Sequence, residues 1–175
     1  VNTKGMESQV TVSKNYTIYF IANLEGVRNN YGIYRSEYKN GRYLKPEALP
    51  EQINSKGLDW TPWISADEDM LLWSSWRDGG QGSGDLYVSF RSKSDPKQWS
   101  DAINLGPEIN RGDNERFPSL SPDGKYLFFL SDKLDPYLEK NKKLAHSEVM
   151  KYYFQAGNGM CDFYWVKGDF IRKLK

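Results

Sequence analysis

Two acidic residues in this sequence occur at matched places and could bind a cation or a polar ligand. Asp59 and Glu115 are 56 residues apart, and they are followed by Trp60 and Arg116 respectively. Carboxylate oxygens suit Ca²⁺ and also accept hydrogen bonds from ligands. The interpretation that we favour is structural: each carboxylate binds backbone N–H groups of the neighbouring blade.

Two tryptophans stand in positions that the sequence places in loops. Exposed aromatic rings stack on sugars, so Trp60 and Trp76, with acids nearby, suggest a carbohydrate site; packing is the more common role of a loop tryptophan. Arg77 has a counterpart in Lys133, again 56 residues later, and such repetition argues for an internal network. The candidate ligand-binding set is therefore Asp59, Trp60, Trp76, Arg77, Glu115 and Arg116.

Catalytic and metal-binding patterns find little support. One cysteine, Cys161, and one histidine, His146, exclude an intrachain disulfide and argue against a Cys/His zinc site. Cys161 adjoins a strand-like run, where we expect a buried thiol. No Gly-x-Ser-x-Gly elbow occurs, and Asp123 and Gly124 are adjacent where a sialidase-type Asp box has a residue between them. We predict no catalytic residue, metal or cofactor.

Charge and hydropathy argue against two classes of partner. The 24 Lys and Arg residues balance 23 Asp and Glu residues, a net charge of +1, so nothing favours nucleic acid or an anionic membrane surface. The chain contains no run of about 18 apolar residues, so we expect no membrane insertion. The 15% aromatic content is typical of β-sheets.

The candidate residues belong to a unit that repeats along the chain. Segment 59–75 matches segment 115–131, including an acid, a proline, a serine and an aspartate, and 17–22 matches 70–75 at an offset of 53. Each unit reads as four short strands joined by turns, such as the Ser-Pro-Asp-Gly turn at 121–124. Four antiparallel strands about every 50 residues form the blade of a β-propeller.

The third unit is interrupted. Residues 134–160 form an insertion, for which a short helix is predicted at 147–154. A strand is predicted at 163–166, and 170–174 is a candidate for the last strand of the unit. A long insertion in a repeat loop usually sits on one face of the assembly.

These residues resemble the TolB-type, WD40-like β-propeller repeats of bacterial envelope proteins. The run 117–132 is very close to that family's core motif, and 74–80 followed by 84–87 resembles the motif's continuation. Trp76 departs from the family, which usually has Asp there. The resemblance implies the propeller fold and an exported bacterial protein, periplasmic or extracellular. It implies no single activity.

We therefore expect an all-β protein of about three four-stranded antiparallel blades. Their bounds are predicted as 10–58, 59–114 and 115–175, with 1–9 a tail or the end of a preceding blade. Closed propellers usually have at least four blades, so we expect either missing N-terminal blades of a larger propeller or self-association. The chain also begins at Val1, which indicates a removed leader or a piece of a longer protein.

The predicted function is that of a non-catalytic binding or protein-interaction module, with a protein or glycan ligand at the mouth of the propeller channel. The alternative is a glycan-binding or glycoside-cleaving, sialidase-like propeller. Acid pairs are available for it, but nothing in the sequence specifies two carboxylates at the separation that glycoside chemistry needs.

Overall fold

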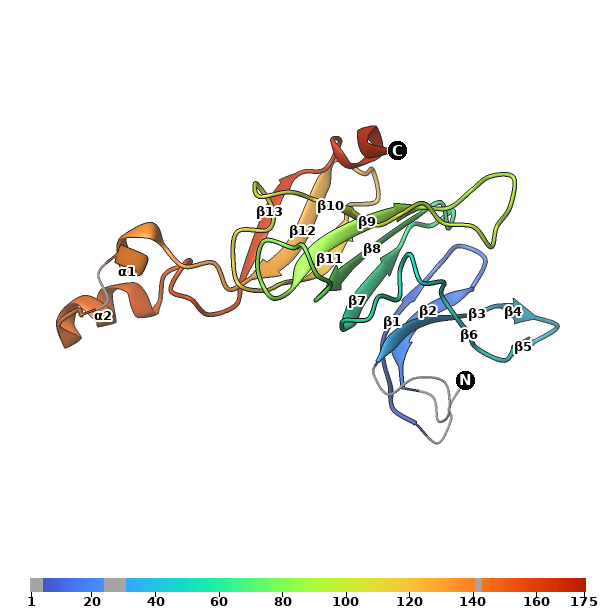
Figure 1. Ribbon diagram of the computed structural model, residues 1–175, viewed down its shortest axis with the longest axis horizontal. Helices are drawn as coiled ribbons and strands as arrows, with labels where there is room; N and C mark the ends of the chain where they lie inside the picture. The colour runs from blue at the N-terminus through green and yellow to red at the C-terminus, as the bar shows by residue number, and fades with distance from the viewer. Residues whose placement is uncertain (1–4, 24–30, 141–142) are drawn as a thin grey trace.

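A computed structural model describes residues 5–23, 31–140 and 143–175, which form three successive antiparallel β-sheets and a projecting insertion (Figure 1). Blade 1 contains β1 (Glu7–Val12), β2 (Ile18–Ala22), β3 (Gly32–Ser36) and β6 (Glu47–Ala48), with a side hairpin of β4 (Tyr38–Lys39) and β5 (Arg42–Tyr43). Blade 2 contains β7 (Asp59–Ile64), β8 (Met70–Ser75), β9 (Asp85–Phe90) and β10 (Ile103–Asn104). Blade 3 contains β11 (Glu115–Leu120), β12 (Tyr126–Ser131) and β13 (Asp162–Lys167).

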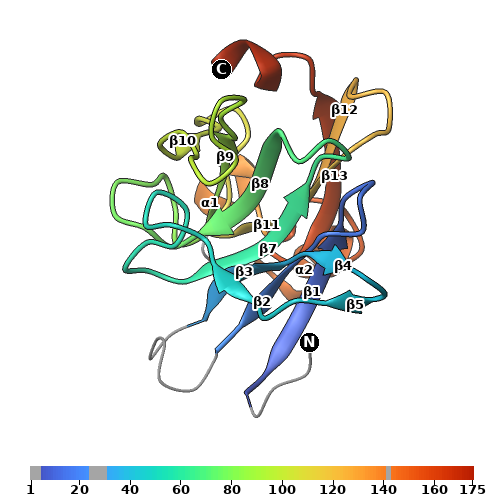
Figure 2. The same cartoon turned by 90° about the vertical axis from the view of Figure 1, so that its right-hand side faces the viewer.

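The predicted all-β blade architecture is confirmed, and strand periodicity explains how the blades stack. Successive side chains of a strand point to opposite faces, so a strand in a middle blade must be apolar on both. Leu71 and Trp73 of β8 pack toward blade 1 with Tyr19, whereas Leu72 packs toward blade 3 with Leu127. All six residues of β8 are consequently buried. Figure 2 looks along this stack from the side of blade 1.

The turn between the first two strands has one geometry in all three blades. In each turn a residue with positive φ donates its N–H to the carbonyl of a serine three residues earlier; these residues are Tyr16, Glu68 and Gly124. Glycine adopts this left-handed conformation freely, but a side chain makes it costly. The serines at 65 and 121 also accept a hydrogen bond from the first residue of the next strand.

The innermost strand of every blade carries a bulge at one matched residue. Gln9, Thr61 and Phe117 have φ between 49° and 54°, and the strand register shifts at each of them. The bulges are linked across blades, because the Thr61 N–H donates to Gln9 Oε1 (3.0 Å) and the Phe117 N–H donates to Thr61 Oγ1 (3.1 Å). A short polar relay therefore joins the inner walls of the three blades.

Blade 3 differs from the prediction at its end. The segment expected as the last strand forms instead a 3-10 helix, η1 (Ile171–Leu174), so that this blade has three strands. The chain turns at Gly168, whose N–H donates to the Lys125 carbonyl, and Ile171 is then buried in the core between blades 2 and 3. Burial of that side chain explains why the segment leaves the sheet.

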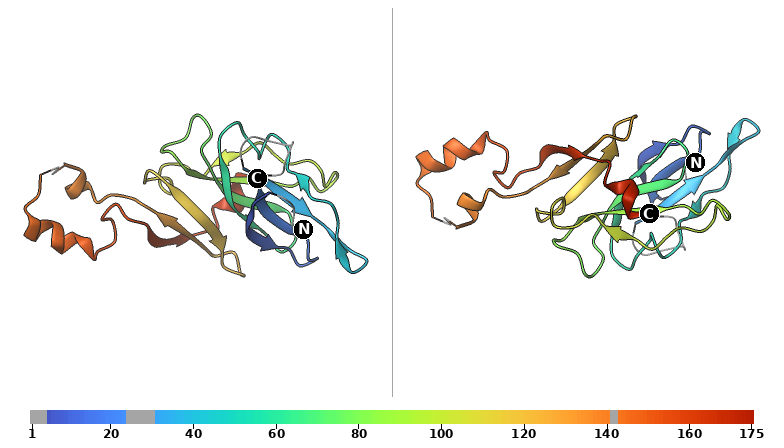
Figure 3. Two further views of the ribbon diagram at one scale, coloured as in Figure 1. Left: turned by 90° about the horizontal axis from the view of Figure 1, so that it is seen from below. Right: turned by 90° about the horizontal axis from the view of Figure 1, so that it is seen from above.

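The insertion projects away from the blades in the views of Figures 1 and 3. It contains α1 (Pro136–Lys140) and α2 (His146–Tyr153), so the predicted helix is present with a shift of one residue. At the other end of the chain, β1 begins at Glu7, within the segment that the sequence placed before blade 1. Within residues 5–23, 31–140 and 143–175, none of the helices has the length and hydropathy that crossing a bilayer requires.

Candidate functional site

The six candidate residues gather at one end of blades 2 and 3, which we call the mouth face. Strand pairing places Asp59, Ser75 and Asp85 side by side in blade 2, and Glu115 and Ser131 at the equivalent places in blade 3. The connections 76–84, 111–114 and 132–161 all leave the blades at this end. The insertion is thus an enlarged loop of the mouth face.

Asp59 is a buried structural acid. Its Oδ2 accepts hydrogen bonds from the backbone N–H (2.6 Å) and hydroxyl of Ser55, and its Oδ1 accepts them from Trp73 Nε1 (3.1 Å) and the Ser75 hydroxyl (2.7 Å). Arg77 Nη2 lies 3.3 Å from the same oxygen. Every accepting direction of this carboxylate is therefore occupied from within the protein; one donor is a backbone N–H, as predicted, and the others are side chains.

Arg77 completes that network and joins two blades. Its guanidinium lies over the rings of Trp73 and Tyr87, 5.3 and 4.8 Å from their centroids. It also donates to the backbone carbonyls of Gln52 and Ile53, which belong to the connection from blade 1. A planar guanidinium can make these stacked and in-plane contacts at once.

Glu115 occupies the same position in blade 3 without an equivalent cation. Its Oε1 accepts hydrogen bonds from the Gly112 N–H and the Ser131 hydroxyl, both 2.6 Å, while Oε2 is buried and has no hydrogen-bond partner. The matching cation, Lys133, lies over the Tyr164 ring, 5.7 Å from its centroid. Burial raises the pKa of Glu115, and the hydrogen bonds from Ser131 and Gly112 oppose that shift only in part.

Replacing Glu115 with glutamine should remove a pH-dependent loss of stability. Because the folded-state pKa is raised, the favourable contribution of this group is complete below the unfolded pKa and is lost as the pH rises through the folded value. Denaturant unfolding at about pH 4 and about pH 7 measures the effect. We expect Glu115→Gln to be more stable, relative to the unmodified protein, at about pH 7 than at about pH 4. If the difference in unfolding free energy between the two proteins is the same at both pH values, the raised pKa is contradicted.

The two candidate tryptophans are half-buried and pack within the protein. Trp60 is wrongly predicted to be a loop residue, because it is the second residue of β7 and pairs with Ser74. The Trp60 ring meets the edge of Tyr31 at a centroid distance of 5.3 Å. Trp76 follows β8, and its ring lies against Gly84, where an added Cβ would come within 3.0 Å of it. A side chain at position 84 would therefore require the Trp76 ring to move by a few tenths of an ångström.

Arg116 lies at the edge of the mouth face near the base of the insertion. Its Nη2 is 3.8 Å from Asp132 Oδ2 and 3.3 Å from the Cys161 sulfur. The prediction of a buried Cys161 thiol is wrong: this residue is exposed, because it precedes β13 instead of lying within the strand. Asp132 is held by Asn114, whose backbone N–H and side-chain amide both donate to its carboxylate.

A buried ion cluster lies between blades 1 and 2, and the sequence does not predict it. Glu68 accepts hydrogen bonds from Ser13 Oγ (3.0 Å), Tyr19 OH (2.8 Å) and Arg91 Nη1 (2.8 Å), and Arg35 Nη2 lies 3.8 Å away. Glu68 lies in the turn that matches 121–124 in the next unit. No group of three or more His, Cys, Asp or Glu residues in the described part of the chain could hold a metal ion.

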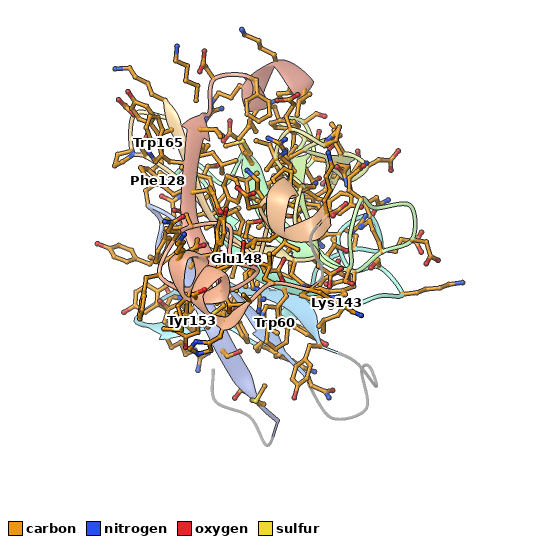
Figure 4. All side chains as sticks on the ribbon, turned by 90° about the vertical axis from the view of Figure 1, so that its left-hand side faces the viewer. Trp60, Phe128, Lys143, Glu148, Tyr153 and Trp165 are labelled. Carbon is orange, nitrogen blue, oxygen red and sulfur yellow. The ribbon has the colours of Figure 1, made fainter. Side chains whose placement is uncertain are left out.

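The insertion encloses an apolar cleft of about 630 Å³. Leu134, Leu138, Leu144, Val149, Tyr153 and Met160 line it, and Lys143 stands at its side. Its base is fixed by hydrogen bonds from the Asp135 N–H to the Gly157 carbonyl and from the Gly157 N–H to Asp162 Oδ2. In Figure 4, Lys143, Glu148 and Tyr153 lie on the projecting part in front of the blades. No residue of α2 is buried.

Comparisons with solved structures show the same fold. The chain is similar to a putative TolB from Agrobacterium tumefaciens (TM-score 0.50, 18% identity, covering 74% of this chain and 39% of that one). It is also similar to TolB from Acinetobacter baumannii (TM-score 0.52, 17% identity, covering 75% and 28%). The chain thus has a TolB-type propeller fold and spans well under half of these proteins. No protein-family model and no curated protein matches it.

Proposed function

We propose that this chain is a non-catalytic protein-interaction module of the β-propeller type, in which the insertion captures an apolar segment of a partner protein. The observation that carries the proposal is the cleft between α1 and α2. An apolar cleft of this size is in the range of natural binding sites, which span roughly 300–1,000 Å³. The blades provide the rigid support that such a binding loop requires.

The chemistry of the cleft favours an amphipathic helix with acidic flanks as its occupant. Val149 and Tyr153, one helical turn apart on α2, are 44% and 52% exposed, so their apolar surface is available for contact. A helix that offers side chains at i and i+4 can fill a cleft of this kind. Segment 134–160 contains four lysines, of which Lys143 lines the cleft, against three acidic residues. This excess of positive charge complements acidic flanks.

A synthetic peptide can test this function directly. The probe is a fluorescein-labelled helix with leucines four residues apart and glutamates at both ends, and the readout is fluorescence anisotropy with the whole chain. We expect binding that weakens by at least about tenfold in Val149→Asp, because a carboxylate would be buried against leucine. Phe154→Asp is the matched control, since Phe154 is 83% exposed and lies outside the cleft lining. Equal affinity in both variants, or no binding of the probe, would refute the proposal.

The mouth face contributes a smaller part of the proposed surface. Asp59 and Glu115 are buried, and Arg77 is paired with Asp59. The residues that keep exposed surface for contact with a ligand are Trp60, Trp76 and Arg116. We propose no glycan ligand, because the half-buried Trp60 and Trp76 rings pack on Tyr31 and Gly84 and nothing observed favours a sugar.

We further propose that the module belongs to the envelope of a bacterium, in the periplasm or outside the cell. Its motifs resemble the TolB-type repeats of bacterial envelope proteins, and both structural relatives described above are bacterial. The division into blades at 10–58, 59–114 and 115–175 is also a proposal, as is the presence of further N-terminal blades in a larger propeller. Detection of the native protein by fractionation of the source cells tests the location; recovery in the cytosol would contradict it.

A further inference from the structure

Blades 2 and 3 each place matching groups around one buried acid. The acids are Asp59 and Glu115; a serine hydroxyl donates to each of them, and a basic residue stands two positions after that serine. In blade 2, Arg77 Nη2 lies 3.3 Å from Asp59 Oδ1 while the guanidinium is 4.8 Å from the centroid of the Tyr87 ring. One cation therefore contacts both the acid and the ring.

In blade 3 the same set of groups is incomplete. Lys133 lies over the ring of Tyr164, which matches Tyr87, at 5.7 Å from its centroid. Glu115 is completely buried, and its Oε2 has no hydrogen-bond partner in the described part of the chain. A carboxylate in such a place is unfavourable unless it takes up a proton or pairs with a cation. Glu115 therefore needs one of these two partners.

Lys133 can supply the cation. The Lys133 N–H donates to Ser131 Oγ (3.1 Å), and that hydroxyl donates to Glu115 Oε1 (2.6 Å), so one serine joins the backbone of Lys133 to the acid. A lysine side chain has a flexible four-carbon stem, and Glu115 is one methylene longer than the acid of blade 2. Rotation of the lysine from the Tyr164 ring to Oε2 would reproduce the ion pair of blade 2.

Charged groups from several elements surround Glu115. Burial raises its pKa, hydrogen bonds from Ser131 and Gly112 oppose that shift in part, and the charge of Asp85 adds to it. Arg116 already pairs with Asp132, which leaves Lys133 as the cation that can move. The charged neighbours are Asp85 of β9, Arg116 of β11, Asp132 and Lys133 after β12, and Asp162 of β13, which pairs with Ser131.

Lys133 also stands directly before the insertion. The next residue, Leu134, forms a bridge with Asn158 and lines the apolar cleft. The N–H of Asp135 then donates to the Gly157 carbonyl at 2.7 Å. Because these contacts form the base of the insertion, a change in the conformation of Lys133 would move the wall of the cleft that Leu134 provides.

We propose that Glu115 and Lys133 form a pH-dependent switch at the base of the insertion. While Glu115 carries its proton, Lys133 stays on the Tyr164 ring and the cleft keeps its present shape. As the pH rises, Glu115 releases the proton to solvent, the carboxylate attracts Lys133, and Leu134 moves with it. Peptide capture then weakens as the pH rises. This last consequence rests on the proposed function, whereas the switch itself does not.

Nuclear magnetic resonance of the whole chain, with ¹³C-labelled glutamate and tyrosine, tests the switch. The Glu115 carboxyl and the Tyr164 ring should titrate together, with one midpoint above the ordinary glutamate pKa of about 4.3. Glu115→Gln should abolish that titration of the Tyr164 ring. The Tyr87 ring is the control, because Arg77 is already paired with Asp59 and should not move. A Glu115 midpoint at or below the ordinary value, or a Tyr164 ring that does not follow Glu115, would overturn the proposal.

Two substitutions at Lys133 separate the switch from the effect of burial alone. Lys133→Met removes the charge and keeps most of the length of the side chain, so the Glu115 midpoint should rise by about one pH unit or more. Lys133→Arg offers the cation of blade 2 and should move the midpoint down. Lys133 is half-buried, so far-UV circular dichroism checks the fold of both variants. A midpoint that neither substitution changes would overturn the proposal.

Anisotropy with the fluorescein-labelled helix tests the consequence for the cleft. Affinity for the unmodified chain should fall by about fivefold or more from below to above the Glu115 midpoint, and that of Glu115→Gln should change less. Both proteins contain His146 and bind the same probe, so the difference between their pH dependences reports on Glu115. Equal pH dependence would refute the coupling to the cleft. Absence of binding at every pH would refute the proposed function, while the resonance titration still decides whether the switch exists.

Discussion

Asp59→Ala is expected to destabilise the protein by about 3–5 kcal/mol, the cost of removing one partner from a buried ion pair. The alanine would leave Arg77, Trp73 Nε1 and the Ser75 hydroxyl without their shared acceptor in a site that is closed to water. It would also release the N–H of Ser55, and with it the connection between blades 1 and 2. Chemical denaturation followed by tryptophan fluorescence measures the change.

Two further variants interpret that measurement. Asp59→Asn keeps the side-chain shape, but it places an NH₂ group where two donors now meet an oxygen. The free energy of unfolding of this variant should therefore lie between that of Asp59→Ala and that of the unmodified protein. Asp101→Ala changes an exposed aspartate of the same blade and should alter stability by no more than about 0.5 kcal/mol. A loss below about 1 kcal/mol for Asp59→Ala would show that the network does not support the fold.

Glu68→Ala is expected to have a comparable effect, because Glu68 joins two blades. Ser13 and Tyr19 of blade 1 and Arg91 of blade 2 all donate to this one carboxylate. The alanine would leave the guanidinium of Arg91 partly uncompensated between the blades, at a cost of about 3–5 kcal/mol. Unfolding by urea measures the loss, and Asp67→Ala is the control, since its exposed pair with Lys14 should contribute little.

The same residue should govern part of the acid sensitivity of the fold. Burial opposes ionisation of Glu68, but hydrogen bonds from Tyr19, Ser13 and Thr17 and the charge of Arg91 outweigh it and lower the pKa. Its stabilisation is therefore present above the unfolded pKa and is lost as the pH falls through the folded value. We expect Glu68→Gln to flatten the acid limb of the stability profile. A profile parallel to that of the unmodified protein would contradict the lowered pKa.

The blade architecture could be predicted from sequence because its signals are local and repeated. Alternating apolar residues and the turn at 121–124 are recognisable in one unit, and the offset of 56 extends them to the next. The sequence likewise favours a structural role for Asp59, which is completely buried. The prediction fails where one segment packs against a distant part of the fold. The segment that contains Ile171 is predicted as a strand but forms a 3-10 helix, because the Ile171 side chain fills the core between blades 2 and 3.

The partners of the charged side chains in the site could not be predicted from the sequence. Glu68 lies in an acidic turn that resembles a solvated one, and only the stacking of two blades brings Tyr19 and Arg91 to it. Arg77 and Lys133 align in the repeat and each lies over a tyrosine ring, yet Arg77 also binds a carboxylate. A clue was present at Glu68: a left-handed turn position without glycine needs a compensating interaction, but the conformation itself is not visible in the sequence.

The join between blade 3 and its insertion bears on how such proteins diversify. Ser131 pairs with Asp162 at the end of the sheet just as Ser75 pairs with Asp85, although 30 residues separate the first pair and 9 the second. Lengthening a flexible loop by that ratio costs only about 1 kcal/mol of closure entropy. Natural selection could therefore exchange one recognition segment for another at this position without redesigning the blade, and a protein engineer could graft a foreign loop there by the same logic.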